Sequence, residues 1–359
     1  MRPIVATISL SALRHNLALA RARAPRSRIW AVIKANAYGH GLARAAAALD
    51  AADGFALVEI DAAARLREEG CTKPVLMIEG FFSPGELAEF SARGLVTVVH
   101  DMEQVRMLET SALAAPIAVY LKINSGMNRL GFHPPEARAA LERLRACAGV
   151  SSITLMTHFA GADGEAGVAA QLERLRALDF DPALPRSLAN SAALLRYPET
   201  HADWVRPGIM LYGCSPFADE SAGSLGLKPA MTLRSRIIAV QALQAGDAVG
   251  YGGLFTAPAP MRIGIVACGY AHGYPRSAPG FNGRGTPIVI GGVRTVTVGR
   301  VSMDMLAADI TRIPGAGVGT EATLWGEGLP ADEVAAAAET ISYELLCALA
   351  SHVRVVEVE

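Results

Sequence analysis

Residues 29–41 read Ile-Trp-Ala-Val-Ile-Lys-Ala-Asn-Ala-Tyr-Gly-His-Gly. The apolar, partly β-branched start of this stretch predicts a buried strand that ends on Lys34, and an alanine-rich helix is expected from Leu42. A lysine held at such a strand–loop–helix junction loses solvation, so its amine can condense with a carbonyl as a Schiff base. The strand pattern by itself favours a solvated lysine that closes a buried strand. Asn36, Tyr38 and the glycines that follow favour the reactive role.

Short apolar runs alternate with helix-like segments from residue 28 to about residue 212. The runs are Ile29–Ile33, Gly54–Val58, Val75–Ile78, Val96–Val99, Ile117–Ile123, Ile153–Thr157, Ser187–Ala189 and Gly208–Leu211. Such alternation indicates parallel strands with crossover helices, and eight runs are the number that closes a (β/α)8 TIM-type barrel. We therefore expect an α/β barrel domain over residues 1–220, although the seventh run is weak. A doubly wound open sheet is the alternative that this periodicity leaves open.

The pattern changes after residue 212. A Pro-, Ser- and Gly-rich connection spans residues 215–224, and β-branched runs then follow one another without helices between them. This predicts an antiparallel or mixed, mainly-β domain over residues 225–359. Its expected elements are strands at Ile237–Val240, Arg262–Val266, Ile288–Ile290 and Val293–Val298, and one helix from about Ala331 to Leu349. Residues 1–10 form one more strand-like run, which can pair with this second domain.

The composition indicates a globular chain with a large core. Of 359 residues, 51% are hydrophobic and 19% are charged, and the 33 basic residues nearly balance the 34 acidic ones. This balance gives no electrostatic reason to expect nucleic acid or an anionic membrane as a partner. The sequence contains no recognisable signal peptide and no apolar run of membrane-spanning length, so we expect no membrane association.

Five cysteines are scattered along the chain, and none forms a Cys-x-x-Cys pair. An odd and scattered set predicts reduced thiols rather than a disulfide framework or a zinc site. We therefore expect a cytoplasmic protein without a bound metal.

Polar side chains gather at the ends of the predicted strands. Lys122 lies at the end of the fifth run, with Arg129 in the loop beyond it. His158 follows the sixth run, Ser191 follows the seventh, and Arg206 enters the eighth. Active sites of (β/α)8 barrels lie at the C-terminal ends of the strands, with phosphate often bound after strands seven and eight. Each residue has a structural explanation by itself, but their joint position at one rim favours an active site.

These segments resemble the motifs of alanine racemases, which use pyridoxal 5'-phosphate, and the resemblance spans nearly the whole chain. In the first domain it covers the lysine motif and residues 121–131, 157–160, 189–192 and 205–213. In the second domain it covers residues 249–252, 269–274, 298–304 and 341–344. Any one segment is a weak signal, but so many in the same order across two domains are a strong one.

The resemblance implies roles for individual residues around the cofactor. Lys34 is expected to carry pyridoxal 5'-phosphate and to be one of two acid–base groups, with Tyr270 as the other. The expected phosphate contacts are Tyr38, Ser191, Gly208, Ile209 and Tyr343. His158 is expected beside the cofactor ring and Arg206 at its pyridine nitrogen. Because a guanidinium cannot accept the pyridinium proton, it leaves that nitrogen largely unprotonated and disfavours side reactions such as transamination.

The resemblance also implies a substrate site and a quaternary structure. Arg129 and the backbone around Met303 are expected to contact the substrate carboxylate. Lys122 stands where many members carry a carbamate, which turns a repelling cation into an anion able to orient Arg129. The expected reaction interconverts L-alanine and D-alanine, for peptidoglycan or for alanine catabolism. The expected assembly is a head-to-tail homodimer in which each β domain covers the barrel mouth of its neighbour.

The sequence departs from many relatives at His272, where they carry an aspartate beside the catalytic tyrosine. We expect activity to survive because Tyr270 remains, with a changed charge near the site entrance. Asn124 and Ser125, in place of an Asp-Thr pair, keep the polarity and size.

Three other functions compete with this interpretation. A racemase of serine or of broader specificity would use the same chemistry. A non-catalytic pyridoxal-phosphate-binding protein shares the lysine at the end of the first strand but lacks a second β domain. An amino-acid decarboxylase with the same barrel would be longer and would not match the racemase motifs in both domains. The alanine racemase interpretation is favoured over all three.

Overall fold

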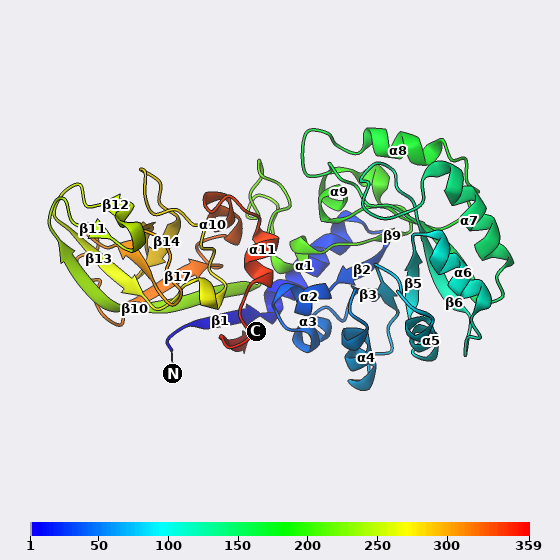
Figure 1. Ribbon diagram of the computed structural model, residues 1–359, viewed down its shortest axis with the longest axis horizontal. Coiled ribbons are helices and arrows are strands. Elements are labelled where there is room, and N and C mark those ends of the chain that lie inside the picture. Colours follow the sequence, from blue (N-terminus) through cyan, green and yellow to red (C-terminus); the bar gives the residue numbers. More distant parts are fainter. Residues whose placement is uncertain (1) are drawn as a thin grey trace.

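Eight short parallel strands form the first half of the molecule. In the computed structural model, which describes residues 2–359, they close a barrel because the last strand pairs with the first through Arg28–Trp204 and Ile29–Val205 (Figure 1). The strands are β2 (Arg28–Val32), β3 (Gly54–Leu57), β4 (Val75–Met77), β5 (Val96–Val99), β6 (Ile117–Lys122), β7 (Val150–Met156), β8 (Arg186–Ser187) and β9 (Trp204–Val205). Most of their side chains are buried, as expected when helices cover the outer face of a parallel sheet. The predicted (β/α)8 barrel is confirmed, and the open sheet is excluded.

The eighth strand lies earlier in the chain than predicted. The segment Gly208–Leu211, expected to be a strand, leads into a 3₁₀ turn over Ile209–Tyr212. The sheet ladder ends near Pro207, because proline has no N–H to donate. Arg206 therefore leaves the eighth strand instead of entering it. This places its side chain at the same rim as the ends of the other strands.

Helices surround the barrel, and one of them comes from an unexpected place in the chain. The crossover helices are α3 (Leu42–Ala48), α4 (Ile60–Glu68), α5 (Pro84–Ala92), α6 (Met102–Thr110), α7 (Pro134–Ala146), α8 (Ala169–Arg176) and α9 (Ser191–Arg196). Within residues 2–359, β9 is followed by the 3₁₀ turn over Ile209–Tyr212 and not by an α-helix of the ring. The place of such a helix is taken by α1 (Leu10–Arg23), which precedes the first barrel strand and contacts α3, α9 and the 3₁₀ turn. Asn16 fixes α1 there by donating to the carbonyls of Leu211 and Lys228 at 3.0 and 2.8 Å.

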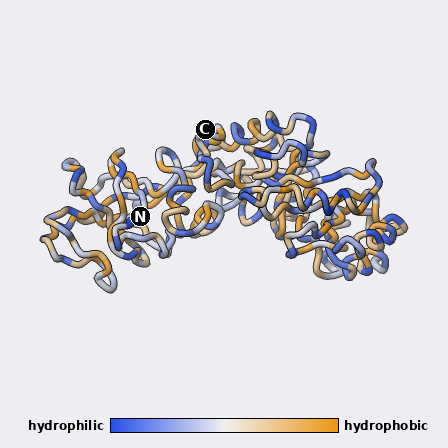
Figure 2. The backbone as a smooth tube through the Cα atoms, turned by 90° about the horizontal axis from the view of Figure 1, so that it is seen from above, coloured by the Kyte–Doolittle hydropathy of each residue, from blue (hydrophilic) through white to orange (hydrophobic). Residues whose placement is uncertain are grey.

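The second half of the molecule is a mixed β domain, as predicted. Its strands are β1 (Val5–Ser9), β10 (Met231–Leu243), β13 (Met261–Val266), β14 (Pro287–Ile290), β15 (Val293–Val298), β16 (Leu306–Asp309), β17 (Glu321–Trp325) and β18 (Arg354–Val358), and a small hairpin joins β11 (Ala248–Val249) to β12 (Phe255–Thr256). Strand β10 is long enough to pair with β17 through its first half and with β13 through its second half. Six of the strands therefore form a closed ring, with β1 added beside β10 and β18 beside β1. Figure 2 shows this body and the barrel from above as two separate masses along one axis.

The helix predicted from Ala331 to Leu349 is two helices. Helix α10 (Ala331–Ala337) stops before Glu339, whose φ of 57° is left-handed, and α11 (Ser342–Cys347) begins in a new direction after Ile341. The break lets α11 lie against the barrel beside residues 34–39 (Figure 1). The contact is close, since a Cβ on Gly39 would lie 2.2 Å from the carbonyl oxygen of Leu346. Through this packing α11 brings Tyr343 to the barrel mouth. No helix among residues 2–359 is long and apolar enough to cross a bilayer.

The first strand of the chain belongs to the sheet of the second body. Strand β1 pairs antiparallel with β10 and parallel with β18, so it lies between two strands that are more than 220 residues away in sequence. Its alternate residues Ala6 and Ile8 are fully buried. The chain therefore begins in the β domain, crosses to the barrel through α1, and returns through β10.

Replacing Ile8 with alanine should destabilise the protein by about 2–5 kcal/mol, because it opens a cavity in this sheet. Thr7→Ala, on the less buried face of the same strand, is the matched control and should cost less than about 1 kcal/mol. The measurement is the urea midpoint of unfolding followed by circular dichroism. Equal midpoints for the two variants would show that β1 adds little to the stability of the sheet.

Candidate active site

Lys34 stands at the start of a left-handed turn that directly follows β2. Within α2 (Lys34–Tyr38), the residues Ala35, Asn36, Ala37 and Tyr38 have φ values of 52°, 53°, 54° and 52°. Left-handed backbone costs an L-residue about 1–2 kcal/mol, so four in succession store on the order of 4–8 kcal/mol. Such strain persists only where the surrounding structure fixes it, and it concentrates at functional sites.

Several hydrogen bonds hold this turn in place. Within it, the N–H of Ala37 donates to the carbonyl of Ile33 at 3.0 Å and the N–H of Gly39 donates to that of Ala35 at 3.1 Å. At its end, the Asn36 Oδ1 accepts from the N–H of Leu42 at 2.9 Å, at the start of α3. The turn thus points Lys34 into the barrel mouth while the next helix is already anchored.

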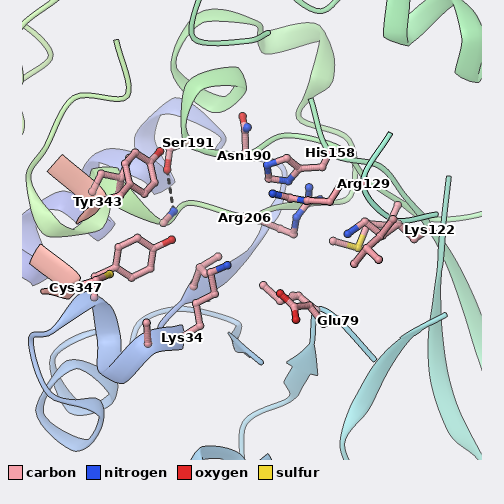
Figure 3. Close-up of a pocket in the computed structure, with 18 residues that line it drawn as sticks. Lys34, Glu79, Lys122, Arg129, His158, Asn190, Ser191, Arg206, Tyr343 and Cys347 are labelled. Carbon is pink, nitrogen blue, oxygen red and sulfur yellow. Dashed lines mark hydrogen bonds between the residues drawn. The ribbon is translucent and has the colours of Figure 1, made fainter. Parts of the chain in front are cut away.

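A cavity of about 640 Å³ occupies the barrel mouth above this turn (Figure 3). Most of the residues predicted for the site line it. They are Lys34, Tyr38, Lys122, Arg129, His158, Ser191, Arg206, Gly208, Ile209 and Tyr343. These side chains come from the ends of different barrel strands and from α11, so the fold alone brings them together.

One end of the cavity has the chemistry of a phosphate site. The Ser191 Oγ lies 2.8 Å from the backbone nitrogen of Gly208 and accepts its hydrogen bond (Figure 3). A Cβ at position 208 would lie 2.8 Å from the hydroxyl oxygen of Tyr38, so only glycine keeps this space open. The hydroxyls of Ser191 and Tyr343 line the same end of the cavity (Figure 3), and the hydroxyl of Tyr38 lies beside Gly208. A hydroxyl-rich cradle with close backbone approach fits a phosphate group.

Arg206 is fixed at the centre of the cavity wall. Its Nη1 donates to the carbonyl and hydroxyl oxygens of Ser187 at 2.7 and 2.8 Å, and its Nη2 donates to the carbonyls of Thr157 and Leu188 at 2.7 and 3.2 Å. Burial lowers the pKa of the guanidinium to about 10, so it stays protonated at neutral pH. The side chain is a rigid donor that cannot accept a proton.

Away from the hydroxyl-lined end, the cavity is lined by several basic side chains, Lys122, Arg129 and Arg206 among them. Burial, reinforced by Arg206 and Arg129, lowers the pKa of Lys122 to about 8. Burial and the same cations lower the pKa of His158 to about 3, so its imidazole is neutral at physiological pH. A cavity with this electrostatic character favours anionic ligands.

Glu79 and Cys347 also line the cavity and were not predicted from the sequence. Glu79 faces the cavity near Lys122 (Figure 3). Its carboxylate opposes part of the lowering of the pKa of that lysine. Glu79 comes two residues after β4, so the strand-end rule that singled out Lys122 and His158 would have found it as well. Cys347 lies on α11, one turn after Tyr343, and nothing in the local sequence marks that position.

Tyr270 and Met303 do not line this cavity. They lie together on the β domain, where the N–H of Tyr270 donates to the carbonyl of Ser302 at 3.1 Å and the N–H of Ala271 donates to that of Met303 at 2.9 Å. Their side chains are 39% and 54% exposed. Within one chain, the structure therefore separates these two residues from the other predicted site residues.

His272, beside Tyr270, is buried in the β domain. Its Nδ1 accepts from the N–H of Gly269 at 3.2 Å, and its ring lies 5.3 Å from that of His352. Burial, with Arg2 and His352 nearby, lowers its pKa below the usual value of histidine. The substitution therefore adds no positive charge at neutral pH.

A closed parallel barrel whose rim gathers lysine, arginine and hydroxyl groups around one cavity, with a β domain attached, defines a two-domain barrel enzyme. Comparison with known proteins makes the assignment specific. Residues 8–216 match the N-terminal domain of alanine racemase and residues 230–357 match its C-terminal domain. The chain belongs to the alanine racemase family, whose members are isomerases.

Individual relatives match along their whole length. An alanine racemase of Nitrosospira multiformis is 58% identical over 97% of this chain and 98% of its own. A catabolic alanine racemase of Klebsiella aerogenes is 53% identical over 99% of each chain. The crystal structure of a biosynthetic alanine racemase from Pseudomonas aeruginosa superposes over 100% of both chains with a TM-score of 0.96 and 48% identity.

The cationic side chains around His158 lower its pKa, so removing one of them should change that pKa. In carbonate-free buffer, Lys122→Met should raise the pKa of His158 by on the order of one unit, because it removes a cation that disfavours the imidazolium. The measurement is an NMR titration of the imidazole. Lys73→Met, at a surface lysine paired with Asp50, is the control and should leave this pKa unchanged. An unchanged value in Lys122→Met would show that the two groups do not interact.

Proposed function

We propose that the protein interconverts L-alanine and D-alanine with pyridoxal 5'-phosphate bound in the barrel mouth. The observation that carries this proposal is the pairing of Lys34 on a strained turn with the hydroxyl-lined cradle around Gly208 in the same cavity. Membership of the alanine racemase family supports the choice of substrate and cofactor. When bound, the cofactor supplies an electron-withdrawing ring that makes the α-proton of an attached amino acid removable.

The cavity residues divide into holding and reacting groups. Tyr38, Ser191, Tyr343 and the backbone of Gly208 and Ile209 would hold the phosphate. Lys34, at the other side of the cradle, would hold the aldehyde carbon and move a proton on one face of the substrate.

Arg206 and His158 would set the electronic character of the site. The four hydrogen bonds of Arg206 to backbone and hydroxyl oxygens fix its plane, so it can donate toward the ring nitrogen without yielding a proton. His158 would lie beside the ring as a neutral group, because burial and the surrounding cations hold its pKa low. With the cofactor bound, this environment would restrain charge build-up on its ring and favour proton return over transamination.

Arg129 would bind the substrate carboxylate, with Lys122 behind it. We propose that Lys122 is carbamylated, since carbamate formation needs a neutral amine and the pKa of this lysine is lowered to about 8. The carbamate would replace repulsion between two cations by a charge-assisted pair with Arg129. Incubation with 13C-labelled bicarbonate near pH 8 should then give a carbamate carbon signal in the NMR spectrum of the unmodified protein that is absent from Lys122→Met.

A second proton-transfer group is required on the opposite face of the substrate, and we propose Tyr270 of a partner subunit. Tyr270 and Met303 are exposed on the β domain of their own chain, beside other exposed apolar side chains at Tyr251, Leu254 and Met305. These residues adjoin one another, since Gly250 approaches the backbone of Arg300 and the 269–271 backbone bonds to Ser302 and Met303. An apolar patch of this kind suits an interface. A head-to-tail C2 dimer would place it over the barrel mouth of the neighbour and complete two equivalent sites.

The biological role stays open between two alternatives. The relatives include a racemase described as catabolic and one described as biosynthetic, so similarity supports D-alanine supply for peptidoglycan and alanine breakdown equally. Racemisation of serine or of a broader set of amino acids is the competing specificity. Scattered free cysteines support a cytoplasmic location.

The protein loaded with pyridoxal 5'-phosphate should racemise alanine in both directions and prefer it to serine, as measured by coupled assays for each enantiomer. Lys34→Ala should lose both the visible absorbance of the bound cofactor and more than about 99% of turnover, because no other amine stands at the turn. Arg106→Ala, at an exposed arginine on α6 paired with Glu103, is a matched control for loss of a cation. Retained visible absorbance in Lys34→Ala would assign the cofactor to another lysine.

Mixed dimers should reveal whether the sites are shared. Tyr270→Phe by itself should keep the cofactor spectrum and lose most turnover in both directions, because one face of the substrate has no proton donor. When Lys34→Ala and Tyr270→Phe chains are co-expressed, each mixed dimer would hold one intact site, so about a quarter of wild-type activity should return. Continued inactivity of a mixture that contains verified mixed dimers would mean that each chain builds its own site.

A further inference from the structure

His40 lies directly behind the strained turn and has no place in the chemistry described so far. Its ring is fully buried, and its Nδ1 lies 2.9 Å from the carbonyl oxygen of Tyr38 and 3.1 Å from that of Ala37. Because both oxygens can only accept hydrogen bonds, Nδ1 must carry the proton. Burial lowers the pKa of the imidazole to about 4, so the ring is a neutral donor with one fixed tautomer over the physiological range.

The two carbonyls belong to left-handed residues. Ala37 and Tyr38 have φ values of 54° and 52°, and their carbonyls point where a right-handed turn would not send them. The carbonyl of Ala37 also accepts from the backbone N–H of His40, whereas His40 Nδ1 is the partner that the structure gives to the carbonyl of Tyr38. The imidazole therefore bonds selectively to the left-handed form of this segment.

An aromatic stack ties the same residues to the barrel. Tyr212 lies between Tyr38 and His40, with ring centroids 4.6 Å from each. The hydroxyl of Tyr212 donates to the carbonyl of Val32 at 2.9 Å, at the last residue of β2. The turn is thus held at Val32 before it starts and at Tyr38 and His40 where it ends, with Lys34 between these points.

We propose that His40 is a positioning residue whose Nδ1–H, shared between the carbonyls of Ala37 and Tyr38, locks the left-handed turn and so fixes Lys34 relative to the phosphate cradle. This inference rests on the proposed function, because the geometry it protects is that of a lysine and a tyrosine holding one cofactor. His40 itself contacts neither cofactor nor substrate.

Two variants of similar side-chain shape separate the effect of the hydrogen-bond donor of His40 from the effect of its side-chain volume. Asparagine at position 40 can place an amide N–H near the position of Nδ1, whereas leucine has the same branching without a donor. Both variants lose the aromatic stack equally. We expect His40→Leu to bind pyridoxal 5'-phosphate about tenfold more weakly and to lose the visible circular dichroism of the bound cofactor. We expect His40→Asn to stay within about threefold of the unmodified protein, because it keeps the donor, whereas a tenfold loss is about 1.4 kcal/mol and falls within the range of one hydrogen bond.

A second comparison tests whether the loss comes from the turn. Ala35 is exposed and left-handed, so Ala35→Gly relieves backbone strain without opening a core cavity. If His40 holds the turn against that strain, Ala35→Gly should raise cofactor affinity by a larger factor in the His40→Leu background than in the unmodified protein. His15→Leu removes another histidine–carbonyl bond, to Gly226 at 2.8 Å and outside the cavity, and should change neither affinity nor dichroism.

The outcomes distinguish this inference from the proposed function. If the unmodified protein binds no pyridoxal 5'-phosphate, the proposed function fails before His40 is tested. If it binds the cofactor, equal losses in His40→Asn and His40→Leu, or unchanged affinity in His40→Leu, would overturn the positioning role. The melting temperatures of the cofactor-free variants show whether the substitutions destabilise the whole protein. General destabilisation should lower the melting temperature of both variants by the same amount. If His40→Leu does not fold, the comparison is made between the two position-40 variants in the Ala35→Gly background.

Discussion

A left-handed turn of four L-residues is the constraint on which the site depends. Lys34 precedes the four left-handed residues and Tyr38 is the last of them, and both side chains line the cavity. The backbone strain of the turn is offset by its contacts with β2, with α3 and with α11. Three separate parts of the fold therefore converge on one strained segment.

The second feature is an excess of positive charge that the protein does not neutralise by itself. Lys34, Lys122, Arg129 and Arg206 line one cavity, and Glu79 is the carboxylate among the lining residues. Folding must keep these cations close together without bound anions, which costs stability. A phosphate, a substrate carboxylate and a carbamate would each remove part of this repulsion. The cavity thus gains most from ligands that bring negative charge to particular positions.

Much of this architecture could be read from the sequence, and the exceptions have physical reasons. The alternation of apolar runs and the polar residues at their ends identified the barrel and its rim, because strand polarity places all those ends on one face. The eighth strand was misplaced because Gly208–Leu211 is as apolar as a strand, although Pro207 had already ended the ladder. The last helix was drawn through Glu339 because glutamate carries no signal for left-handed backbone. The turn after Lys34 was missed for the same reason, since alanine and tyrosine normally favour right-handed structure. The separation of Tyr270 from the cavity depends on the relative orientation of the barrel and the β domain, which no local sequence pattern predicts.

The path of the chain has a consequence for its synthesis on the ribosome. Strand β1 is made before both of its partners, because β10 and β18 follow it by more than 220 and 340 residues. At 5–20 residues per second, β18 emerges roughly 20–70 s after β1. During that interval the barrel can already close, with α1 in its ring, while one edge of β1 waits for β10 and the other waits for β18. The nascent protein therefore carries an exposed strand edge until β18 is made, and this is the period in which a chaperone could act on it.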